Sequence, residues 1–360
     1  MKERLAKTFL DLVKISEVYP EEEKIIEYIE SFLDGLKLDH QKDNFGNIIV
    51  KVSGQSSPVM INTHMDIPEP NPELKVIREG DIIQSDGSSI LGADPKSGLA
   101  VILEFLRGVS KRKERRRALE IVFTRGEEAG LKGALNLDYS LLDSKLGLVL
   151  DEDGPVTQVV IQAPAFVMMD VEFQGKTAHS RDPDKGINAL QVASQAISQV
   201  PWGYSHSEVT WNIGFLRAGT ARNSIPGIAY LQAELRSYKK DLAQSESERI
   251  ADIFKEVAGY FGADCQVELD PVFGSYKLER DQPLFRELEN TYNKMNLKPN
   301  YFATFGGSDA NVFNDNGITS VPIGSGYHNA HQYSEYISLS EMVELKTFLD
   351  LFCFGDQKFE

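Results

Sequence analysis

Four apolar segments of the chain each run into histidine or carboxylate side chains. In chain order these endings are His64 with Asp66, Glu127 with Glu128, Asp151-Glu152-Asp153, and His328 with His331. If the segments are parallel strands, their carboxyl ends meet at one edge of a sheet, which is where α/β proteins bind ligands. Imidazole and carboxylate groups are ligands of hard and borderline cations. The four endings therefore predict a shared metal site.

Each of these endings also has an ordinary structural explanation when it stands alone. His64 and Asp66 are two residues apart on an extended segment, so their side chains point the same way. That geometry suits a metal-binding imidazole whose second nitrogen donates to a carboxylate, and equally a polar strand end. Glu127 and Glu128 are adjacent acids, which repel each other unless a cation or solvent screens them. We interpret one as a metal ligand and the other as a group for proton transfer, with a solvated loop as the alternative.

Further candidates lie outside these pairs. Asp94 precedes a proline and a helical segment, which is typical of a helix N-cap, and one oxygen of such a carboxylate can still face a metal. His328 and His331 are three residues apart, so either both or only one of them would bind a metal. His179 lies at 175–180, and a lone histidine is more often structural than functional. The sequence by itself leaves the roles of these three histidines open.

Other catalytic chemistries are disfavoured by motifs that the sequence lacks. It has no Gly-x-Ser-x-Gly nucleophile elbow, and its two cysteines, Cys265 and Cys353, lie in segments that look structural. Two cysteines exclude a disulfide scaffold, and they form no CxxC zinc motif. The segment Gly306-Gly307-Ser308-Asp309 resembles an anion cradle at a helix N-terminus. It lacks the Lys-Ser/Thr pair of a phosphate loop, so nucleotide binding is not expected.

The composition is that of an acidic globular protein. Of 360 residues, 38 are Lys or Arg and 54 are Asp or Glu, which gives a net charge of −16. This charge disfavours nucleic acids and anionic membrane surfaces as partners. The N-terminal residues lack the features of a signal peptide and no apolar stretch is long enough to span a membrane, so a cytoplasmic location is expected. The basic run at 111–117 is interpreted as a solvated segment.

The elements that must position the candidate residues alternate between strands and helices at both ends of the chain. Two helices are expected in the first 36 residues, broken near Tyr19-Pro20. Strands are expected at Asn47–Val52, Val59–Thr63, Leu119–Thr124, Leu146–Leu150 and Thr319–Ile323, and helices at Leu99–Val109, Leu284–Met295 and Ser340–Phe352. This alternation predicts an α/β domain with a mainly parallel sheet.

The pattern changes between residues 165 and 269. The expected order there is strand, helix, strand, strand, helix, strand, at Phe166–Phe173, Gly186–Val200, Val209–Leu216, Ile228–Leu235, Asp241–Phe261 and Cys265–Leu269. This is the order of a ferredoxin-like α+β domain. We therefore predict one α/β domain at 1–164 and 270–360, with a smaller domain inserted at 165–269.

Taken together, the motifs resemble those of the di-zinc exopeptidase family that includes peptidase T, carboxypeptidase G and aminoacylase. The matching segments, in the order of the family, are Thr63–Asp66, Leu91–Asp94, Phe123–Gly130, Asp151, Ala178–Ser180, Asn223–Pro226, Glu234–Ser237 and His331. Ser85-Asp86-Gly87 and Phe305–Asn311 most resemble the peptidase T-like branch. The sequence departs from the family at Pro95, because the family usually has a second Asp directly after the residue that corresponds to Asp94. This proline changes the shape of the turn but does not replace a metal ligand.

The resemblance implies two divalent metal ions bound by residues of the α/β domain. The implied ligands are His64 and Asp151 for one ion, Glu128 and His331 for the other, and Asp94 as the bridge. Zinc is the expected metal, with cobalt or manganese as alternatives. Glu127 would be the general base, and Asp66 would orient His64.

The inserted domain falls where the family carries its lid and dimerisation domain. The resemblance therefore implies a homodimer formed through the lid, with His179 polarising the substrate carbonyl in the partner's active site. Asn223 and Arg236 would bind polar groups of the substrate, and Arg236 suits a carboxylate because of its forked geometry.

The activity that the resemblance implies is metal-dependent hydrolysis of short peptides, most like that of a tripeptide aminopeptidase. An N-acyl amino acid amidohydrolase or a carboxypeptidase would use the same site and is the first alternative. A non-catalytic binding protein that retains the fold is the second, because a fold does not determine function. A requirement for a free substrate amine distinguishes the aminopeptidase from the amidohydrolase.

Overall fold

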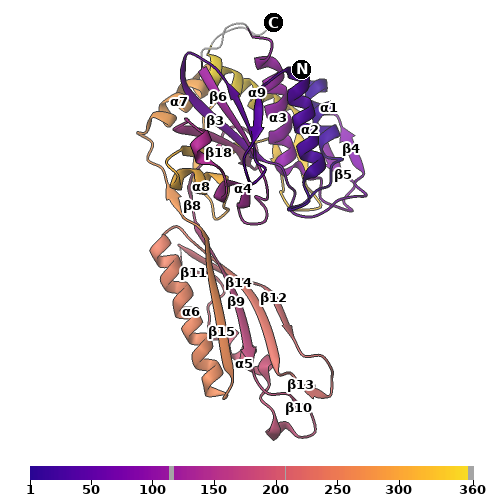
Figure 1. The fold of residues 1–360 in the computed structure, drawn as a ribbon, viewed down its shortest axis with the longest axis vertical. Coiled ribbons are helices and arrows are strands. Elements are labelled where there is room, and N and C mark those ends of the chain that lie inside the picture. The colour runs from indigo at the N-terminus through magenta and orange to yellow at the C-terminus, as the bar shows by residue number, and fades with distance from the viewer. Residues whose placement is uncertain (113–116, 207, 356–360) are drawn as a thin grey trace. The chain divides into compact units, whose positions relative to one another are not determined.

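The computed structural model describes residues 1–112, 117–206 and 208–355, which divide into two compact units (Figure 1). Unit 1 comprises Met1–Ile161, Lys277–Ala303 and the segment from Ser308 onwards, and unit 2 comprises Gln162–Tyr276 and Thr304–Gly307. Unit 2 ends later than the insertion expected at 165–269 because its last strand continues to Phe273. Part of the basic run at 111–117 lies outside the described residues.

Unit 1 is built on a large sheet whose central strands run parallel. In spatial order these strands are β6 (Arg117–Thr124), β3 (Ser56–His64), β7 (Leu146–Glu152) and β18 (Thr319–Gly324). The strands that extend the sheet at its edges are β1 (His40–Lys42), β2 (Ile48–Val52), β8 (Gln158–Ala163), β16 (Tyr276–Lys277) and β17 (Asn300–Ala303). The prediction of a mainly parallel central sheet is confirmed.

Helix α3 (Ala93–Val109) packs directly on β3 and β7, and nearly all of its side chains are buried. Such a helix must be covered on its outer side as well, and α1 (Lys2–Leu12) and α9 (Leu339–Phe354) pack against it. The remaining α-helices of the unit are α2 (Glu23–Leu36), α4 (Lys132–Leu135), α7 (Pro283–Met295) and α8 (Asp309–Asp315). The two expected N-terminal helices are confirmed.

A small separate sheet, which the sequence analysis missed, also belongs to unit 1. Its strands lie in the order β19 (Tyr327–His328), β20 (Tyr336–Ser338), β5 (Ile82–Ser85) and β4 (Val76–Glu79). Strands this short carry too few residues for a clear alternating pattern. Their importance is that the turn between β19 and β20 contains His331.

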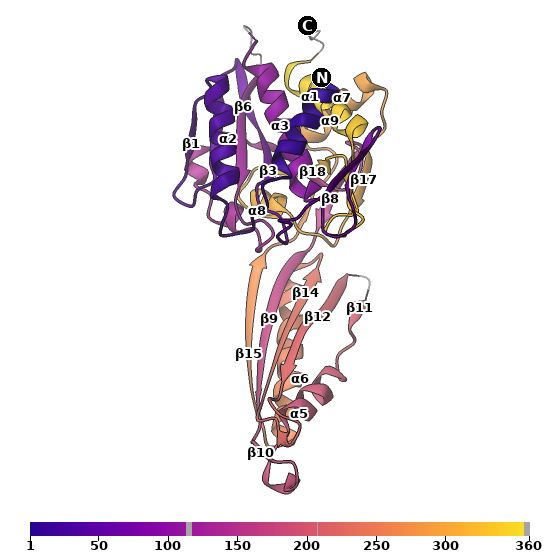
Figure 2. The ribbon, with the colours of Figure 1, turned by 90° about the vertical axis from the view of Figure 1, so that its right-hand side faces the viewer.

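The main sheet of unit 2 is antiparallel and packs its apolar face against two helices (Figure 2). Its elements in chain order are β9 (Ala165–Gln174), α5 (Ala189–Ile197), β11 (Gly203–His206), β12 (Val209–Ala218), β14 (Ile228–Ser237), α6 (Lys240–Tyr260) and β15 (Asp264–Phe273). The spatial order β11-β12-β14-β9-β15 contains the ferredoxin-like arrangement, which confirms the prediction. Strand β11 and the ribbon of β10 (Ala178–His179) with β13 (Ser224–Ile225) were not predicted.

Helix α5 is shorter than the segment 186–200 in which a helix was expected. Ile187 forms an isolated bridge with Lys176, so this part of the chain is extended. The Asn188 side chain then accepts the N–H groups of Leu190 and Gln191 at 3.1 and 3.2 Å and begins the helix. In the part of the chain that the structure describes, no helix is long and apolar enough to cross a lipid bilayer.

Candidate metal centre

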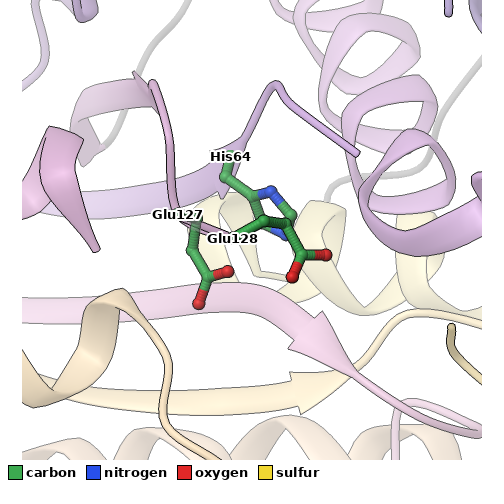
Figure 3. A group of neighbouring side chains, drawn as sticks. All are labelled: His64, Glu127 and Glu128. Atoms are coloured by element: carbon green, nitrogen blue, oxygen red, sulfur yellow. The ribbon is translucent and has the colours of Figure 1, made fainter. Parts of the chain in front are cut away.

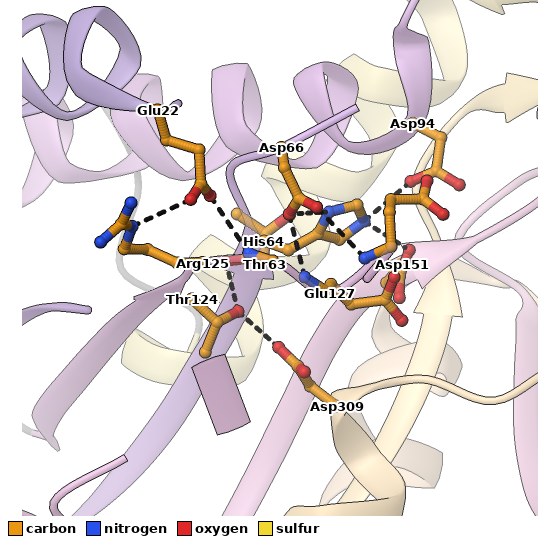
Figure 4. Close-up of polar contacts among 12 residues, drawn as sticks. Glu22, Thr63, His64, Asp66, Asp94, Thr124, Arg125, Glu127, Asp151 and Asp309 are labelled. Carbon is orange, nitrogen blue, oxygen red and sulfur yellow. Dashed lines mark hydrogen bonds and ion pairs between the residues drawn. The ribbon is translucent and has the colours of Figure 1, made fainter. Parts of the chain in front are cut away.

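The carboxyl ends of the parallel strands in unit 1 bring the candidate metal-binding residues to one edge of the sheet (Figure 4). His64 is the last residue of β3, and Asp151 lies near the end of β7. Glu127 and Glu128 lie in the loop that follows β6, and His331 lies beyond the end of β18. The four endings recognised in the sequence therefore meet because their strands are neighbours and run parallel.

Asp94 lies between two histidines and faces one of them with each carboxylate oxygen. Its Oδ1 is 3.0 Å from His64 Nε2, and its Oδ2 is 3.4 Å from His331 Nε2. The same nitrogen of each histidine also faces a second carboxylate, at 3.4 Å for Asp151 Oδ1 and 2.9 Å for Glu128 Oε1. Two donor groups, His64-Asp94-Asp151 and Asp94-Glu128-His331, therefore share Asp94, with the donor atoms of each group within 4.8 Å of one another.

Glu127 lies beside these donor groups. A carboxylate oxygen of Glu127 lies within 4.8 Å of donor atoms of His64 and Glu128, and the three side chains are seen together in Figure 3. Asp66 stabilises this arrangement, because it accepts hydrogen bonds from the backbone N–H groups of Glu127 (3.0 Å) and Glu128 (3.2 Å). Asp66 Oδ1 also lies 3.4 Å from His64 Nδ1. One fully buried carboxylate thus orients an imidazole and both glutamates.

The segment between α1 and α2 supports the start of the Glu127 loop. Glu22 accepts hydrogen bonds from Gly126 N (3.1 Å) and from Arg125 Nε (2.9 Å). Gly126 has φ of +58°, and a Cβ atom at this position would lie 2.5 Å from the ring of Tyr19. Only glycine suits this position, because a side chain would be strained and would collide with the ring. The backbone that leads into Glu127 is therefore fixed by packing and by hydrogen bonds.

Negative charge dominates this buried centre. Burial lowers the pKa of His64, but the surrounding carboxylates, Asp151 foremost, raise it well above its usual range. Hydrogen bonds to two carboxylates raise the pKa of His331 to about 11. Burial raises the pKa of Glu127 well above its usual range. Burial and the surplus of carboxylates over bases together account for these shifts.

The donor residues fit divalent cations. They supply imidazole nitrogen and carboxylate oxygen without sulfur, which is the donor set of zinc, manganese and cobalt sites and not of soft metals. Buried carboxylates in excess are unfavourable unless positive charge is added. The shared Asp94 offers one oxygen to each donor group, as a bridge between two ions requires.

The start of α3 places Asp94 at the centre. The backbone of Asp94 is not helical, with φ of −79° and ψ of 115°, and the regular helix follows it. The N-cap of α3 lies at Gly92 and not at Asp94, where the sequence predicted it. The Asp94–Pro95 peptide bond is cis. Proline is tolerated at this first helical position because its missing N–H would have no partner within the helix. Pro95 therefore takes no ligand away from the site.

The structure distinguishes the two neighbouring histidines. His328 Nε2 lies 2.7 Å from Glu341 Oε2, and the His328 ring stacks on Tyr336 with centroids 4.6 Å apart. His331 instead faces Asp94 and Glu128. Its backbone has φ of +61°, a conformation that residues other than glycine rarely adopt without a structural reason. Of the two, His331 is therefore the one placed for metal binding.

The three candidate residues of the lid all belong to unit 2 but lie in two places. His179 and Asn223 are neighbours, because β10 pairs with β13 and Ser180 N donates to the Asn223 carbonyl at 3.0 Å. Both side chains are exposed. Arg236 lies near the other end of β14, where its Nη1 donates to the Phe305 carbonyl at 2.9 Å. The ten residues of β14 separate the two places by roughly 30 Å.

Sequence reasoning missed two buried charged residues beside the centre, Glu335 and Lys96. Each is 1% exposed. Glu335 accepts hydrogen bonds from the backbone around Asp94, and Lys96 Nζ donates to the Ile15 carbonyl at 2.7 Å. Charged residues are usually exposed, so nothing in the local pattern marked these two as buried. The one available signal was that Glu335 follows closely after His331.

The structure does not support an anion cradle at 306–309. Helix α8 begins at Asp309, whose buried carboxylate accepts a hydrogen bond from Thr124 Oγ1. Burial raises the pKa of Asp309 to about 7. The carboxylate of Asp309 lies at the start of the helix, where an anion was expected to bind. It would repel a second negative charge placed beside it.

The chain matches two protein-family models and is similar to several known proteins. The M20 model described as "Peptidase dimerisation domain" matches residues 165–260, and the model "Peptidase family M28" matches residues 47–158. The protein YqjE of Bacillus subtilis is 30% identical, and the match covers 95% of both chains. A tripeptidase from Staphylococcus aureus has a similar structure, with a TM-score of 0.90 and 28% identity over 98% of both chains. The aminopeptidase PepT from Bacillus cereus has a TM-score of 0.85 and 30% identity, also over 98% of both chains.

The fold and the donor residues are those of a metal-dependent peptidase. The chain belongs to the M20 peptidase family, in its peptidase T-like branch. This confirms the family resemblance that the motifs indicated. Membership implies the use of divalent metal ions, in agreement with the donor groups around Asp94.

Proposed function

We propose that this protein is an aminopeptidase that releases the N-terminal residue of tripeptides and other short peptides with the help of two divalent metal ions. The observation that carries the proposal is the position of Asp94 between two donor groups, with Glu127 beside them. Paired metal sites of this kind are typical of hydrolases, including aminopeptidases. Zinc is the proposed metal, and cobalt and manganese accept the same donors.

The residues around the proposed metal ions would have different roles in the reaction. When bound, the two ions would lower the pKa of a water molecule and polarise the peptide carbonyl. Glu127 would accept the proton of the water as it attacks the carbonyl carbon, and would then pass this proton to the leaving amine. Asp66 would keep Glu127 and His64 in place throughout, because it holds the backbone of one and the ring of the other.

The proposed roles of the lid residues require two chains. A tripeptide extends over about 10 Å, so His179 and Arg236 of one chain, roughly 30 Å apart, cannot both contact it. If both bind substrate, they come from different chains. The match to a peptidase dimerisation domain at 165–260 supports a homodimer. We therefore propose that His179 and Asn223 reach the active site of the partner subunit, and that Arg236 binds substrate in another place.

A panel of three matched compounds tests the proposed activity. The protein is stripped with a chelator and reloaded with zinc, cobalt or manganese, and then given a tripeptide, the same tripeptide N-acetylated, and an N-acyl amino acid. We expect metal-dependent cleavage of the free tripeptide alone, because an aminopeptidase requires the free amine. Cleavage of the acylated compounds instead would show an amidohydrolase with the same site. Tight metal binding without turnover of any compound would favour a binding protein.

Mixed dimers test the proposed action of His179 across subunits. His179→Ala and Glu127→Gln chains are each expected to be nearly inactive alone. When they are refolded together in equal amounts, random pairing should restore about a quarter of the wild-type rate, because each mixed dimer then has one complete site. The rate is measured with the tripeptide, and sedimentation confirms the dimer. A mixture no more active than its parts, despite mixed dimers, would show that His179 does not act in trans.

A further inference from the structure

Glu335 connects two segments of the metal centre that are far apart in the sequence. Its Oε2 accepts a hydrogen bond from Gly92 N at 2.7 Å, and its Oε1 accepts one from Asp94 N at 3.0 Å. The N–H of Ala93 donates to the same carboxylate. The residue is 1% exposed, so solvent cannot easily replace these contacts. A single buried carboxylate thus binds the backbone on both sides of the turn that presents Asp94.

These N–H groups need an acceptor from elsewhere in the fold. The first N–H groups of a helix have no partner within it, and Asp94 stands at the beginning of α3. Gly92 has φ of +72° in this turn, and the N–H groups of Gly92 and Asp94 both donate to the carboxylate of Glu335. Within the described residues, no side chain of the turn itself caps α3. The negative charge of Glu335 also interacts favourably with the positive end of the helix.

The other end of Glu335 belongs to the turn that presents His331. This turn connects β19 and β20, and Glu335 is its last residue before β20. Hydrogen bonds from Gln332 N to the Asn329 carbonyl (3.2 Å) and from Glu335 N to the Gln332 carbonyl (2.9 Å) close it. Because β20 pairs with β5, the turn is anchored to a sheet. The position of Glu335 is therefore fixed relative to His331.

We propose that Glu335 is a positioning residue that fixes the bridging carboxylate of Asp94 relative to His331, and so sets the affinity for the metal ion that these two residues share. This inference rests on the proposed metal site. Glu335 acts through the backbone of the Asp94 turn, whereas Asp66 acts on the His64 ring and on the Glu127 loop. A role limited to capping α3 would affect the stability of the metal-free protein and leave its metal affinity unchanged.

Substitution by glutamine separates these two roles. Glutamine has nearly the same shape but only one acceptor oxygen, so its amide NH2 group would face at least one of the backbone N–H donors. Stripped wild-type and Glu335→Gln proteins are titrated with zinc in competition with a chromophoric chelator. We expect wild type to bind two ions and Glu335→Gln to bind one of them, the ion shared by Asp94 and His331, about 10- to 100-fold less tightly, because substitutions behind metal ligands usually have effects of this size. Thermal unfolding of both stripped proteins shows whether the fold is retained.

Glu341→Gln is the matched control, because Glu341 also accepts a hydrogen bond next to the same turn, from His328, and touches no donor group. Its zinc titration should match wild type. If Glu335→Gln does not fold, Glu335→Asp takes its place. Aspartate keeps both oxygens but is shorter, so this variant should still bind the ion less tightly than wild type, with a loss smaller than that expected for glutamine. Zinc affinity equal to wild type in a folded variant at position 335 overturns the inference. Failure of wild type itself to bind zinc, cobalt or manganese would instead overturn the proposed function, so the two failures are distinguishable.

Discussion

Replacing Glu127 by glutamine should lower kcat by about 10²- to 10⁴-fold, because a positioned general base contributes a factor of this size. Glutamine keeps the length of the side chain and the backbone hydrogen bond to Asp66, but it cannot accept the proton of a water molecule. The proposed ligands are untouched, so the variant should still bind two metal ions per chain. Steady-state kinetics on the tripeptide, with metal analysis of the same preparation, measure both quantities.

The neighbouring residue supplies a matched control. Glu128→Gln is the same substitution one position further along the loop, at a residue whose carboxylate lies 2.9 Å from His331 Nε2. Here we expect loss of one metal ion together with loss of activity, and excess zinc should restore part of the rate. The proposed assignment would be contradicted if Glu127→Gln lost the metal ion and Glu128→Gln kept it. Glu127 would then be the ligand and Glu128 the candidate base.

The segments that carry the candidate ligands could be predicted from sequence because each follows an apolar run that is long enough to recognise. His64, Asp151 and the Glu127 loop come directly after strands of the parallel sheet, and parallel strands deliver their carboxyl ends to one edge. The alternation of residue types along Phe166–Phe173, within β9, likewise made the inserted domain recognisable. For the parallel strands and for the inserted domain, the local pattern was sufficient to predict the elements because it repeats over several of them.

The supporting contacts could not be predicted, because they join segments that are distant in the sequence. Glu335 binds the Asp94 turn across 241 positions, and Glu22 binds Gly126 across 104. A glutamate on such a segment looks like a surface residue until the tertiary structure buries it. The strands β19 and β20, which flank the turn that contains His331, are too short to give a period-two signal. Sequence therefore indicated which residues could bind metal but not what holds them in place.

Substitution of Asp94 by asparagine should weaken binding of both metal ions at once, because Asp94 is the residue that the two donor groups share. Asparagine keeps the shape of the side chain but loses the negative charge and one of the two oxygen donors. A free metal concentration a hundred times the Kd stabilises a folded protein by about 2.7 kcal/mol, which for a domain of this size raises Tm by roughly 5–10 °C. We expect zinc to produce such a rise in stripped wild type and almost none in Asp94→Asn.

Two comparisons make this result specific. Asp143→Asn changes the same side chain at an exposed position, where the carboxylate pairs with Lys51, and should respond to zinc as wild type does. Asp151→Asn removes a ligand from one donor group only, so the ion held by Glu128 and His331 should still bind and produce part of the rise. The decisive quantity is the difference between Asp94→Asn and Asp151→Asn in the zinc-dependent rise in Tm and in the number of bound ions. If the two variants lost the same amount of zinc-dependent stabilisation and the same number of ions, Asp94 would belong to one ion alone, and the proposed bridge between two ions would be wrong.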